Sequence, residues 1–307
     1  MSWILLIIGL TLVTIGATWL TNGAAAIAKK LRISEYVIGM TIVAVGTSLP
    51  ELTVSTASAI AGNADIAIGN IVGSNIFNVL AVLGICALLA AIPFSRNNIR
   101  FDAPMTVVIT LIFTALLFDG SLARWEGLLL LAIYVGVMIF SFIKNRENSE
   151  DETTEEQFVW WRNAGMLVLG IGGLIYGANL TLNASIDIAR ALGVSEAVIA
   201  ITILAVGTSL PELAASVVAA CKGHSALALG NVLGSNIANI LLILGTCSTI
   251  TPLTMSDITM IDLVVMNGAV LAVLFSALVI RRQRISRLEG ALYLIAYISY
   301  VIYLVRH

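Results

Sequence analysis

Two segments of this chain repeat each other, and the repetition restricts the folds that the sequence can adopt. A shift of 161 positions aligns residues 38–84 with residues 199–245 without a gap, and more than half of the aligned residues are identical. The run Gly-Thr-Ser-Leu-Pro-Glu-Leu occurs in full at residues 46–52 and again at residues 207–213. A repeat of this length indicates a chain built from two structurally similar halves.

Both copies lie within long apolar stretches. Hydrophobic residues make up 59% of the 307 positions, charged residues make up 11%, and the mean hydropathy is +1.01, whereas charged residues are about a quarter of a soluble domain. A helix needs about 20 apolar residues to cross a bilayer. The sequence therefore predicts an all-α polytopic membrane protein with ten transmembrane helices, at roughly residues 3–28, 36–61, 65–92, 104–118, 122–143, 163–190, 196–221, 225–250, 258–280 and 288–305.

The number of spans in each half sets their relative orientation. Five is odd, so the second half enters the membrane from the opposite side, and we expect two inverted five-helix repeats. Inverted repeats are typical of secondary transporters, whose site lies at the midplane where broken helices of the two halves meet. We expect the first repeat over residues 1–143, a cytoplasmic linker over 144–162 and the second repeat over 163–307. A folding relic without a transport role is the alternative, but it does not explain why the identity is concentrated in polar motifs.

The basic residues are distributed unevenly over the predicted loops. Thirteen Lys and Arg residues follow the odd-numbered spans, and three lie on the other side. By the positive-inside rule, this bias predicts that both termini lie outside. We expect an integral protein of the cell (inner or plasma) membrane. The first basic residue, Lys29, follows the first span, so we do not expect that span to be a cleaved signal peptide.

The predicted linker carries a short acidic run. Its acidic residues are Glu147, Glu150, Asp151, Glu152, Glu155 and Glu156. We interpret the run as a solvated linker. Weak attraction of divalent cations is the alternative interpretation.

Each copy of the repeated motif places one carboxylate at membrane depth, on Glu51 and on Glu212. A charged side chain at the centre of a bilayer costs about 2.5–3.5 kcal/mol on insertion scales, so the default hypothesis is an ion or substrate site. Pro50 and Pro211 precede the two acids. Because proline has no N–H, we expect each helix to be interrupted beside its carboxylate, which releases backbone carbonyls as cation ligands.

Further polar residues accompany the carboxylates in both copies. Hydroxyl residues lie one helical turn before each acid, and a stripe of amide and hydroxyl residues recurs every four positions in the next span. These residues are Thr47, Ser48, Asn70, Ser74 and Asn78 in the first half, and Thr208, Ser209, Asn231, Ser235 and Asn239 in the second. Glycine pairs in the same spans indicate close helix packing, in which the amides would act as interhelical glue. We expect both roles, with glycines bringing the helices together and polar side chains lining the space between them.

All of these candidate ligands are oxygens. Oxygen coordination with 6 to 8 ligands suits calcium, and smaller subsets suit sodium. Soft ligands are missing from the predicted site, so a zinc or copper site is not expected. Two carboxylates balance one divalent cation, and an empty pair of buried charges is costly. The protein should therefore change conformation only when loaded, as an exchanger does, with calcium, several sodium ions or protons as alternate loads.

The two copies of Gly-Thr-Ser-Leu-Pro-Glu and of Gly-Asn-x-x-Gly-Ser-Asn-x-x-Asn resemble the two alpha repeats of the calcium/cation antiporter superfamily, and within it the sodium/calcium exchangers. The resemblance covers nearly the whole chain. It implies a compact exchanger of the prokaryotic type, because the short linker has no room for the regulatory calcium-binding domain of eukaryotic relatives.

The resemblance also implies roles for individual residues. The implied calcium ligands are Glu51, Glu212, Thr47 and Thr208. The implied sodium ligands are Ala44, Ser48, Ser74, Ala205, Ser209 and Ser235 together with Glu51 and Glu212, and Asn78 and Asn239 are implied to lie nearby. The Thr-Ser-Leu-Pro sequence favours sodium over proton coupling, and Asn239 disfavours potassium coupling, because potassium-dependent relatives carry Asp there.

The sequence thus predicts sodium/calcium antiport, with proton/calcium antiport as the alternative in the same class. An intramembrane hydrolase is disfavoured because the predicted membrane segments provide no positioned His or Asp pair. An oxygen-lined channel is a third class. We expect no enzyme activity, no catalytic residue, no cofactor and no nucleic-acid partner. The expected partners are calcium and sodium ions and the lipid bilayer, and the sequence does not indicate an oligomeric state.

Overall fold

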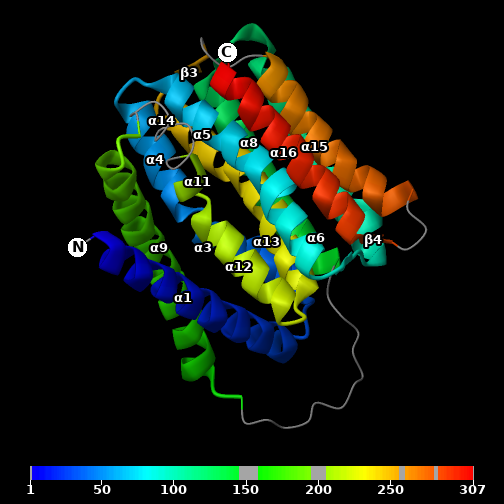
Figure 1. Ribbon diagram of the computed structural model, residues 1–307. Coiled ribbons are helices and arrows are strands. Elements are labelled where there is room, and N and C mark those ends of the chain that lie inside the picture. The colour runs from blue at the N-terminus through cyan, green and yellow to red at the C-terminus, as the bar shows by residue number, and fades with distance from the viewer. Residues whose placement is uncertain (1, 145–157, 195–204, 256–259, 280–282, 307) are drawn as a thin grey trace.

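The computed structural model describes residues 2–144, 158–194, 205–255, 260–279 and 283–306, and it is built almost entirely of helices (Figure 1). The first half forms α1 (Ser2–Leu31), α2 (Glu35–Ile38), η1 (Gly39–Val43), α3 (Ala44–Thr47), α4 (Leu49–Ile60), α5 (Ala64–Phe77), η2 (Asn78–Leu83), α6 (Gly84–Leu89), β1 (Ile92–Pro93), η3 (Asn98–Asp102), α7 (Ala103–Leu116), η4 (Leu117–Asp119), β2 (Ser121–Leu122) and α8 (Arg124–Lys144). The second half forms α9 (Trp160–Ala191), α11 (Ala205–Gly207), α12 (Leu210–Cys221), α13 (Ser225–Ile237), η6 (Ala238–Leu244), α14 (Gly245–Ile250), β3 (Leu253–Thr254), α15 (Met260–Val279), β4 (Arg284–Ile285) and α16 (Arg287–Arg306).

Many of these helices are long and apolar enough to cross a membrane. The described ranges contain eight such helices, if consecutive short elements that continue one another are counted together, and a ninth that is bent by 47° between Glu35–Thr47 and Leu49–Ile60. The all-helical polytopic membrane fold is therefore confirmed. The seventh predicted span, residues 196–221, lies partly outside the described residues, so the count of ten spans stays a prediction.

Two long helices lie on either side of the predicted linker. Helix α9 begins at Trp160, three residues before the predicted start at residue 163, and α8 extends to Lys144. The Phe158 and Trp160 rings meet edge to face with centroids 4.9 Å apart, and Lys30 Nζ lies 5.7 Å from the Phe158 centroid. The acidic run of the predicted linker lies outside the described residues.

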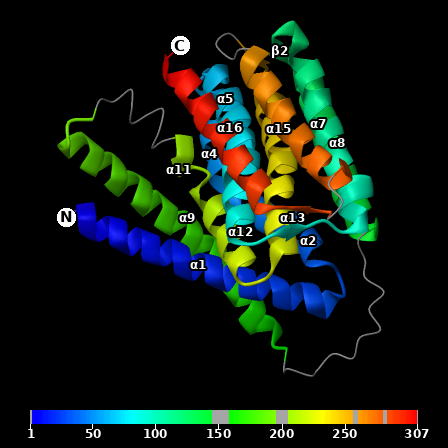
Figure 2. The same ribbon diagram turned by 45° about the vertical axis from the view of Figure 1, so that its right-hand side comes forward.

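Helices α1 and α9 cross at one side of the bundle and contact each other far more than they contact the other helices (Figures 1 and 2). Glycine makes this approach possible. A Cβ atom on Gly170 would lie 2.6 Å from Leu20 N and 2.9 Å from Gly16 O. Because both of these are backbone atoms, no rotamer change could relieve the clash. The two helices therefore form a closely packed pair.

The most deeply buried long helices are the continuous rods α5–η2–α6 and α13–η6–α14. Each follows one of the repeated Gly-Thr-Ser-Leu-Pro-Glu-Leu motifs and carries one copy of the amide and hydroxyl stripe. In contrast, α16 lies at the outside of the bundle with most of its side chains exposed (Figure 2). The stripe residues are thus buried except for the partly exposed Asn70, and the apolar outer faces are left for lipid.

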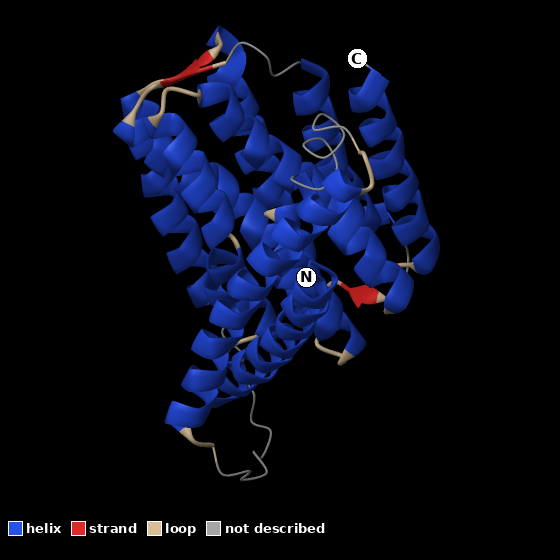
Figure 3. Cartoon of the chain, turned by 60° about the vertical axis from the view of Figure 1, so that its left-hand side comes forward, coloured by secondary structure: helices blue, strands red, loops and turns tan. Residues whose placement is uncertain are grey.

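Two short antiparallel strand pairs connect loops of the two halves at opposite ends of the bundle (Figure 3). Strand β1 pairs with β4, with Ile92 opposite Ile285. Strand β2 pairs with β3, with Ser121 opposite Thr254. Each pair therefore ties a loop of the first half to a loop of the second.

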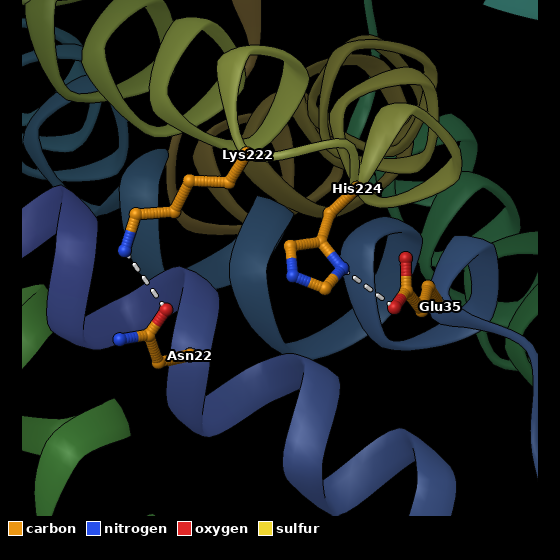
Figure 4. A network of polar contacts seen from close by, with 4 residues as sticks. All are labelled: Asn22, Glu35, Lys222 and His224. Atoms are coloured by element: carbon orange, nitrogen blue, oxygen red, sulfur yellow. Dashed lines mark hydrogen bonds and ion pairs between the residues drawn. The ribbon is translucent and has the colours of Figure 1, made fainter.

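The loop between α12 and α13 makes polar contacts with the first half (Figure 4). Lys222 Nζ donates to Asn22 Oδ1 on α1 at 2.9 Å. His224 Nδ1 lies 2.7 Å from Glu35 Oε1 at the start of α2. Partly exposed pairs of this kind contribute at most about 1 kcal/mol. They act mainly by fixing where this loop meets α1 and α2.

The packing of α1 on α9 generates a stability prediction. Gly170→Val should lower the unfolding temperature of the detergent-solubilised protein, because a side chain forced into backbone contact costs about 1–3 kcal/mol. Gly172→Val on the same helix is the matched control, because a Cβ there meets no atom within 4 Å. The comparison is made by thermal unfolding of the two variants. Equal unfolding temperatures for both would contradict the close packing of α1 on α9.

Candidate ion-binding site

Each of the two acidic residues lies in the first turn of a helix that follows a break. The break falls at Ser48 (φ −84°, ψ 8°) before α4 and at Ser209 (φ −90°, ψ 11°) before α12. Pro50 and Pro211 lie just inside the new helices, where a missing N–H sacrifices no intrahelical hydrogen bond. The predicted interruption is present, but the prolines start the second helix rather than interrupt the first.

This arrangement places opposite partial charges around the break. The N-terminal end of α4 favours the carboxylate of Glu51, and the N-terminal end of α12 favours that of Glu212. The last carbonyls of the segment that ends at Thr47 lie on the other side of the break. Carbonyls at such interrupted helix ends coordinate cations in membrane transporters. The breaks thus combine carboxylate and carbonyl oxygens in one place.

Each carboxylate is hydrogen-bonded by the serine of the opposite half. Ser48 Oγ donates to Glu212 Oε1 at 2.9 Å, and Ser209 Oγ donates to Glu51 Oε1 at 2.9 Å. Ser74 Oγ lies 3.0 Å from Ser209 Oγ and 3.5 Å from Glu51 Oε1. All five side chains are buried. The structure therefore brings together Glu51, Glu212, Ser48, Ser209 and Ser74, as the sequence predicted.

Asn231 of α13 forms hydrogen bonds with both broken helices. Its Oδ1 accepts a hydrogen bond from Thr47 Oγ1 at 3.2 Å, and its Nδ2 donates to Ser216 Oγ at 2.9 Å and to the carbonyl of Glu212 at 3.4 Å. The repeat-related Asn70 donates to Ser55 Oγ at 3.0 Å. The packing role of the amide stripe is thus realised at Asn70 and Asn231. Ser55 and Ser216 were not predicted, although both copies of the repeat contain them.

Several buried oxygens of the site have no hydrogen-bond partner within the described part of the chain. They are Oε2 of Glu51, Oε2 of Glu212, Oγ1 of Thr208, Oγ of Ser235 and Oδ1 of Asn239. An unpaired buried polar group costs about 1–3 kcal/mol, and a charged one costs more. These oxygens come from both halves and have the chemistry to coordinate a hard cation. Neither polar atom of the Asn78 amide has a partner there either.

The other predicted site residues differ between the two halves in their hydrogen bonds. The carbonyl of Ala44 accepts from Ser48 N at 3.0 Å and from Thr47 Oγ1 at 3.3 Å, so Thr47 has two neighbouring acceptors. Thr208 Oγ1 has no hydrogen-bond partner among the residues that the structure describes, although Thr208 is the repeat counterpart of Thr47. Ala205 begins α11, and its side chain lies outside the described residues. The two halves therefore present the same residues in different hydrogen-bonding states.

A groove of about 380 Å³ between α5, α15 and α16 reaches Ser74. Its lining also includes Asn70, Asp262 and Tyr300, and Tyr300 Oη donates to Asp262 Oδ1 at 2.7 Å. No group of three or more His, Cys, Asp and Glu side chains that could hold a metal is found in the described ranges. Serine hydroxyls, which carry neutral oxygens, are hydrogen-bonded to the carboxylates of Glu51 and Glu212.

The chain is similar in sequence to known proteins. The chain matches the sodium/calcium exchanger protein family over residues 1–143 and 162–306. It is 39% identical to a putative antiporter, CaxA, of Alkalimonas amylolytica over 307 aligned residues, which cover 97% of this chain and 96% of that protein. It is 30% identical to the sodium/calcium exchanger MaX1 of Methanosarcina acetivorans, over 99% of this chain and 98% of the relative.

A solved structure is also similar. The sodium-calcium exchanger NCX_Mj, soaked with 2.5 mM Na⁺ and 0.1 mM Ca²⁺, superposes with a TM-score of 0.87 at 29% sequence identity. The superposition covers 98% of this chain and 97% of that structure. The fold of NCX_Mj is thus shared over essentially the full length of both chains.

The unpaired carboxylate oxygens generate a second prediction. Glu212→Gln should raise the unfolding temperature in ion-free buffer with chelator by about 2 °C or more, the shift expected for roughly 1 kcal/mol, because it removes a buried charge that lacks a full set of partners. Glu126→Gln is the matched control. Glu126 is also buried, but its Oε2 accepts the Ala123 N–H at 2.7 Å, so neutralising it should lower the unfolding temperature. A lower value for Glu212→Gln as well would contradict the unpaired state of that carboxylate.

Proposed function

Because the chain belongs to the sodium/calcium exchanger protein family, we propose that it is a secondary active antiporter that exchanges sodium for calcium across the membrane by alternating access. One observation carries the proposal. Glu51 and Glu212 come from different halves, are buried, and are each hydrogen-bonded by the serine of the other half. Each also keeps one oxygen without a partner within the described residues.

The proposed calcium site lies between these carboxylates. Calcium is bound by Glu51 and Glu212, with Thr47 and Thr208 as further ligands. The Thr208 hydroxyl, which has no partner in the described part of the chain, supports this assignment. The proposed sodium ligands are Ala44, Ser48, Ser74, Ala205, Ser209 and Ser235, together with the two carboxylates. The short distances from Ser48, Ser74 and Ser209 to the carboxylates support their inclusion. Asn78 and Asn239 flank the site.

Charge balance explains why such a site exchanges ions instead of conducting them. One calcium ion neutralises the charge of two carboxylates. Sodium ions bound to the same two carboxylates neutralise it as well. Without a cation the two buried charges lack compensation, which costs several kcal/mol for each ion taken out of water. The loaded protein therefore reorients more readily than the empty one, and transport of one ion is coupled to return of the other. Protons could also neutralise the carboxylates, which makes proton/calcium antiport the alternative.

We propose ten spans in two inverted five-helix repeats, with both termini outside. The strand pairs support the inversion. The 161-residue shift relates β1 to β3, yet β1 pairs with β4 at one end of the bundle while β3 pairs with β2 at the other (Figure 3). Equivalent loops of the two halves thus lie at opposite ends, as an inverted repeat requires. The orientation of the termini rests on the excess of Lys and Arg in the loops after odd-numbered spans.

A transport assay tests the proposed function. Purified protein in proteoliposomes loaded with sodium should take up calcium when diluted into sodium-free buffer, with the pH clamped on both sides. Collapse of the sodium gradient should stop the uptake. If calcium uptake depends on a pH gradient and not on sodium, the coupling ion is the proton. Single-channel currents in a planar bilayer would overturn carrier-type exchange altogether.

The same assay tests the two carboxylates. Glu51→Gln and Glu212→Gln should each reduce the initial rate of calcium uptake at least about 100-fold, because loss of one partner of a buried charged set costs roughly 3–5 kcal/mol. Glu126→Gln is the control, since Glu126 lies in the first turn of α8, accepts the Ala123 N–H and is not a proposed ligand. Its uptake should stay within about twofold of the unmodified protein. Near-normal uptake by either site variant would refute the calcium assignment.

A further inference from the structure

Helices α5 and α13 are connected by a reciprocal pair of side-chain amides that the sequence pattern did not single out. Asn75 Nδ2 donates to the carbonyl of Asn236 at 3.4 Å, and Asn236 Nδ2 donates to the carbonyl of Asn75 at 3.2 Å. Both side chains are buried, and the 161-residue shift relates them to each other. Asn75 and Asn236 directly follow Ser74 and Ser235 in the chain. The pair therefore fixes α5 against α13 beside the proposed ion site.

The two asparagines are not equivalent in their remaining contacts. Asn75 Oδ1 accepts a hydrogen bond from Asn239 Nδ2 at 2.9 Å. The corresponding contact in the other half would join Asn78 to Asn236. Within the described residues, however, Asn236 Oδ1 has no partner, and neither does either polar atom of the Asn78 amide. Within the described residues, Asn239 is therefore held by Asn75, whereas the equivalent bond between Asn78 and Asn236 is not formed.

This contact decides which end of the Asn239 amide is available. A side-chain amide has a donor end, NH₂, and an acceptor end, the carbonyl oxygen. Asn75 takes the donor end, so the buried Oδ1 of Asn239 is the end left without a partner in the described part of the chain. A carbonyl oxygen attracts a hard cation, whereas an NH₂ group repels it. Asn75 itself cannot rotate its amide without losing the bond from its Nδ2 to the Asn236 carbonyl.

We propose that Asn75 is a positioning residue that orients the Asn239 amide so that its carbonyl oxygen, and not its NH₂ group, is presented to the transported cation. The inference rests on the proposed exchange function and deepens it. It makes the two halves unequal, because the Asn239 amide is oriented by Asn75, whereas the Asn78 amide has no partner among the described residues. The apparent affinity for calcium should therefore depend on Asn75 through Asn239.

The test uses two matched variants, Asn75→Leu and Asn236→Leu. Both replace a buried amide by a side chain of similar shape, and both remove one bond between α5 and α13, but only the first releases Asn239. In proteoliposomes, Asn75→Leu should raise the KM for calcium about 10-fold or more, the range found when an outer partner of a metal ligand is lost. Asn236→Leu should raise it less than about threefold. Equal increases in the two variants would overturn the inference, because they would indicate a merely structural role.

A double-mutant cycle separates action through Asn239 from an independent effect. If Asn75 acts through Asn239, adding Asn75→Leu to Asn239→Leu should raise the KM for calcium by less than about threefold, the effect expected from loss of the α5–α13 bond alone. If the increases in the KM for calcium caused by the two substitutions multiply in the double variant, the inference is contradicted.

A comparison that leaves Asn75 intact provides a second test in case Asn75→Leu fails to fold. Asn239→Leu should raise the KM for calcium more than Asn78→Leu does, and equal effects would overturn the proposed inequality. The thermal shift of each purified variant on addition of calcium chloride reports binding independently of transport. If the unmodified protein shows neither sodium-driven uptake nor a calcium-induced shift, the proposed exchange function fails. If it shows both and the asparagine variants behave alike, only the role of Asn75 fails.

Discussion

The crossed serine–carboxylate hydrogen bonds are the constraint on which the rest of the structure depends. Ser48 of the first half holds Glu212 of the second, and Ser209 of the second half holds Glu51 of the first. Both of these short bonds cross between the halves, whereas the serine–carboxylate contact within the first half, from Ser74 Oγ to Glu51 Oε1, is longer at 3.5 Å. These two bonds therefore form only when the halves are docked with the two helix breaks next to each other.

The surrounding architecture maintains this alignment. Asn231 connects Thr47, Ser216 and the carbonyl of Glu212, and the amides of Asn75 and Asn236 fix the central helices against each other. The strand pairs hold the loops at both ends of the bundle. In contrast, the α1–α9 pair relies on close backbone contact through glycine. Polar bonds determine the alignment of the central helices, whereas shape determines the packing of the outer pair.

Much of this could be predicted from the sequence because the determinants are local or repeated. Apolar length predicts membrane helices, and proline beside an acid at membrane depth predicts a break. The sequence therefore indicated Glu51, Glu212 and their neighbouring hydroxyls as candidate ligands. Asn75 and Asn236 were missed because they lie outside the four-residue stripe of Asn70, Ser74 and Asn78, although both copies of the motif contain them. Their partners are backbone carbonyls of another helix, which no spacing rule within a single helix can reveal.

The internal repeat also could not predict the differences between the halves. The sequence gives Thr47 and Thr208 the same surroundings in the chain, yet only Thr47 has a hydrogen-bond partner among the described residues. Such differences depend on how the two halves meet. Two copies of one motif around a shared site need not be in the same state at the same time.

The position of the two prolines has a further consequence, which concerns the unfolded chain. Pro50 and Pro211 lie in the first turn of α4 and α12, where their fixed φ angle matches the helix. A proline that fits its native conformation reduces the conformational entropy lost on folding and contributes about 0.4–1 kcal/mol. Part of the ordering of each break is therefore built into the covalent structure. The chain is stiffened beside each carboxylate before any ion, or the other half, is in contact with it.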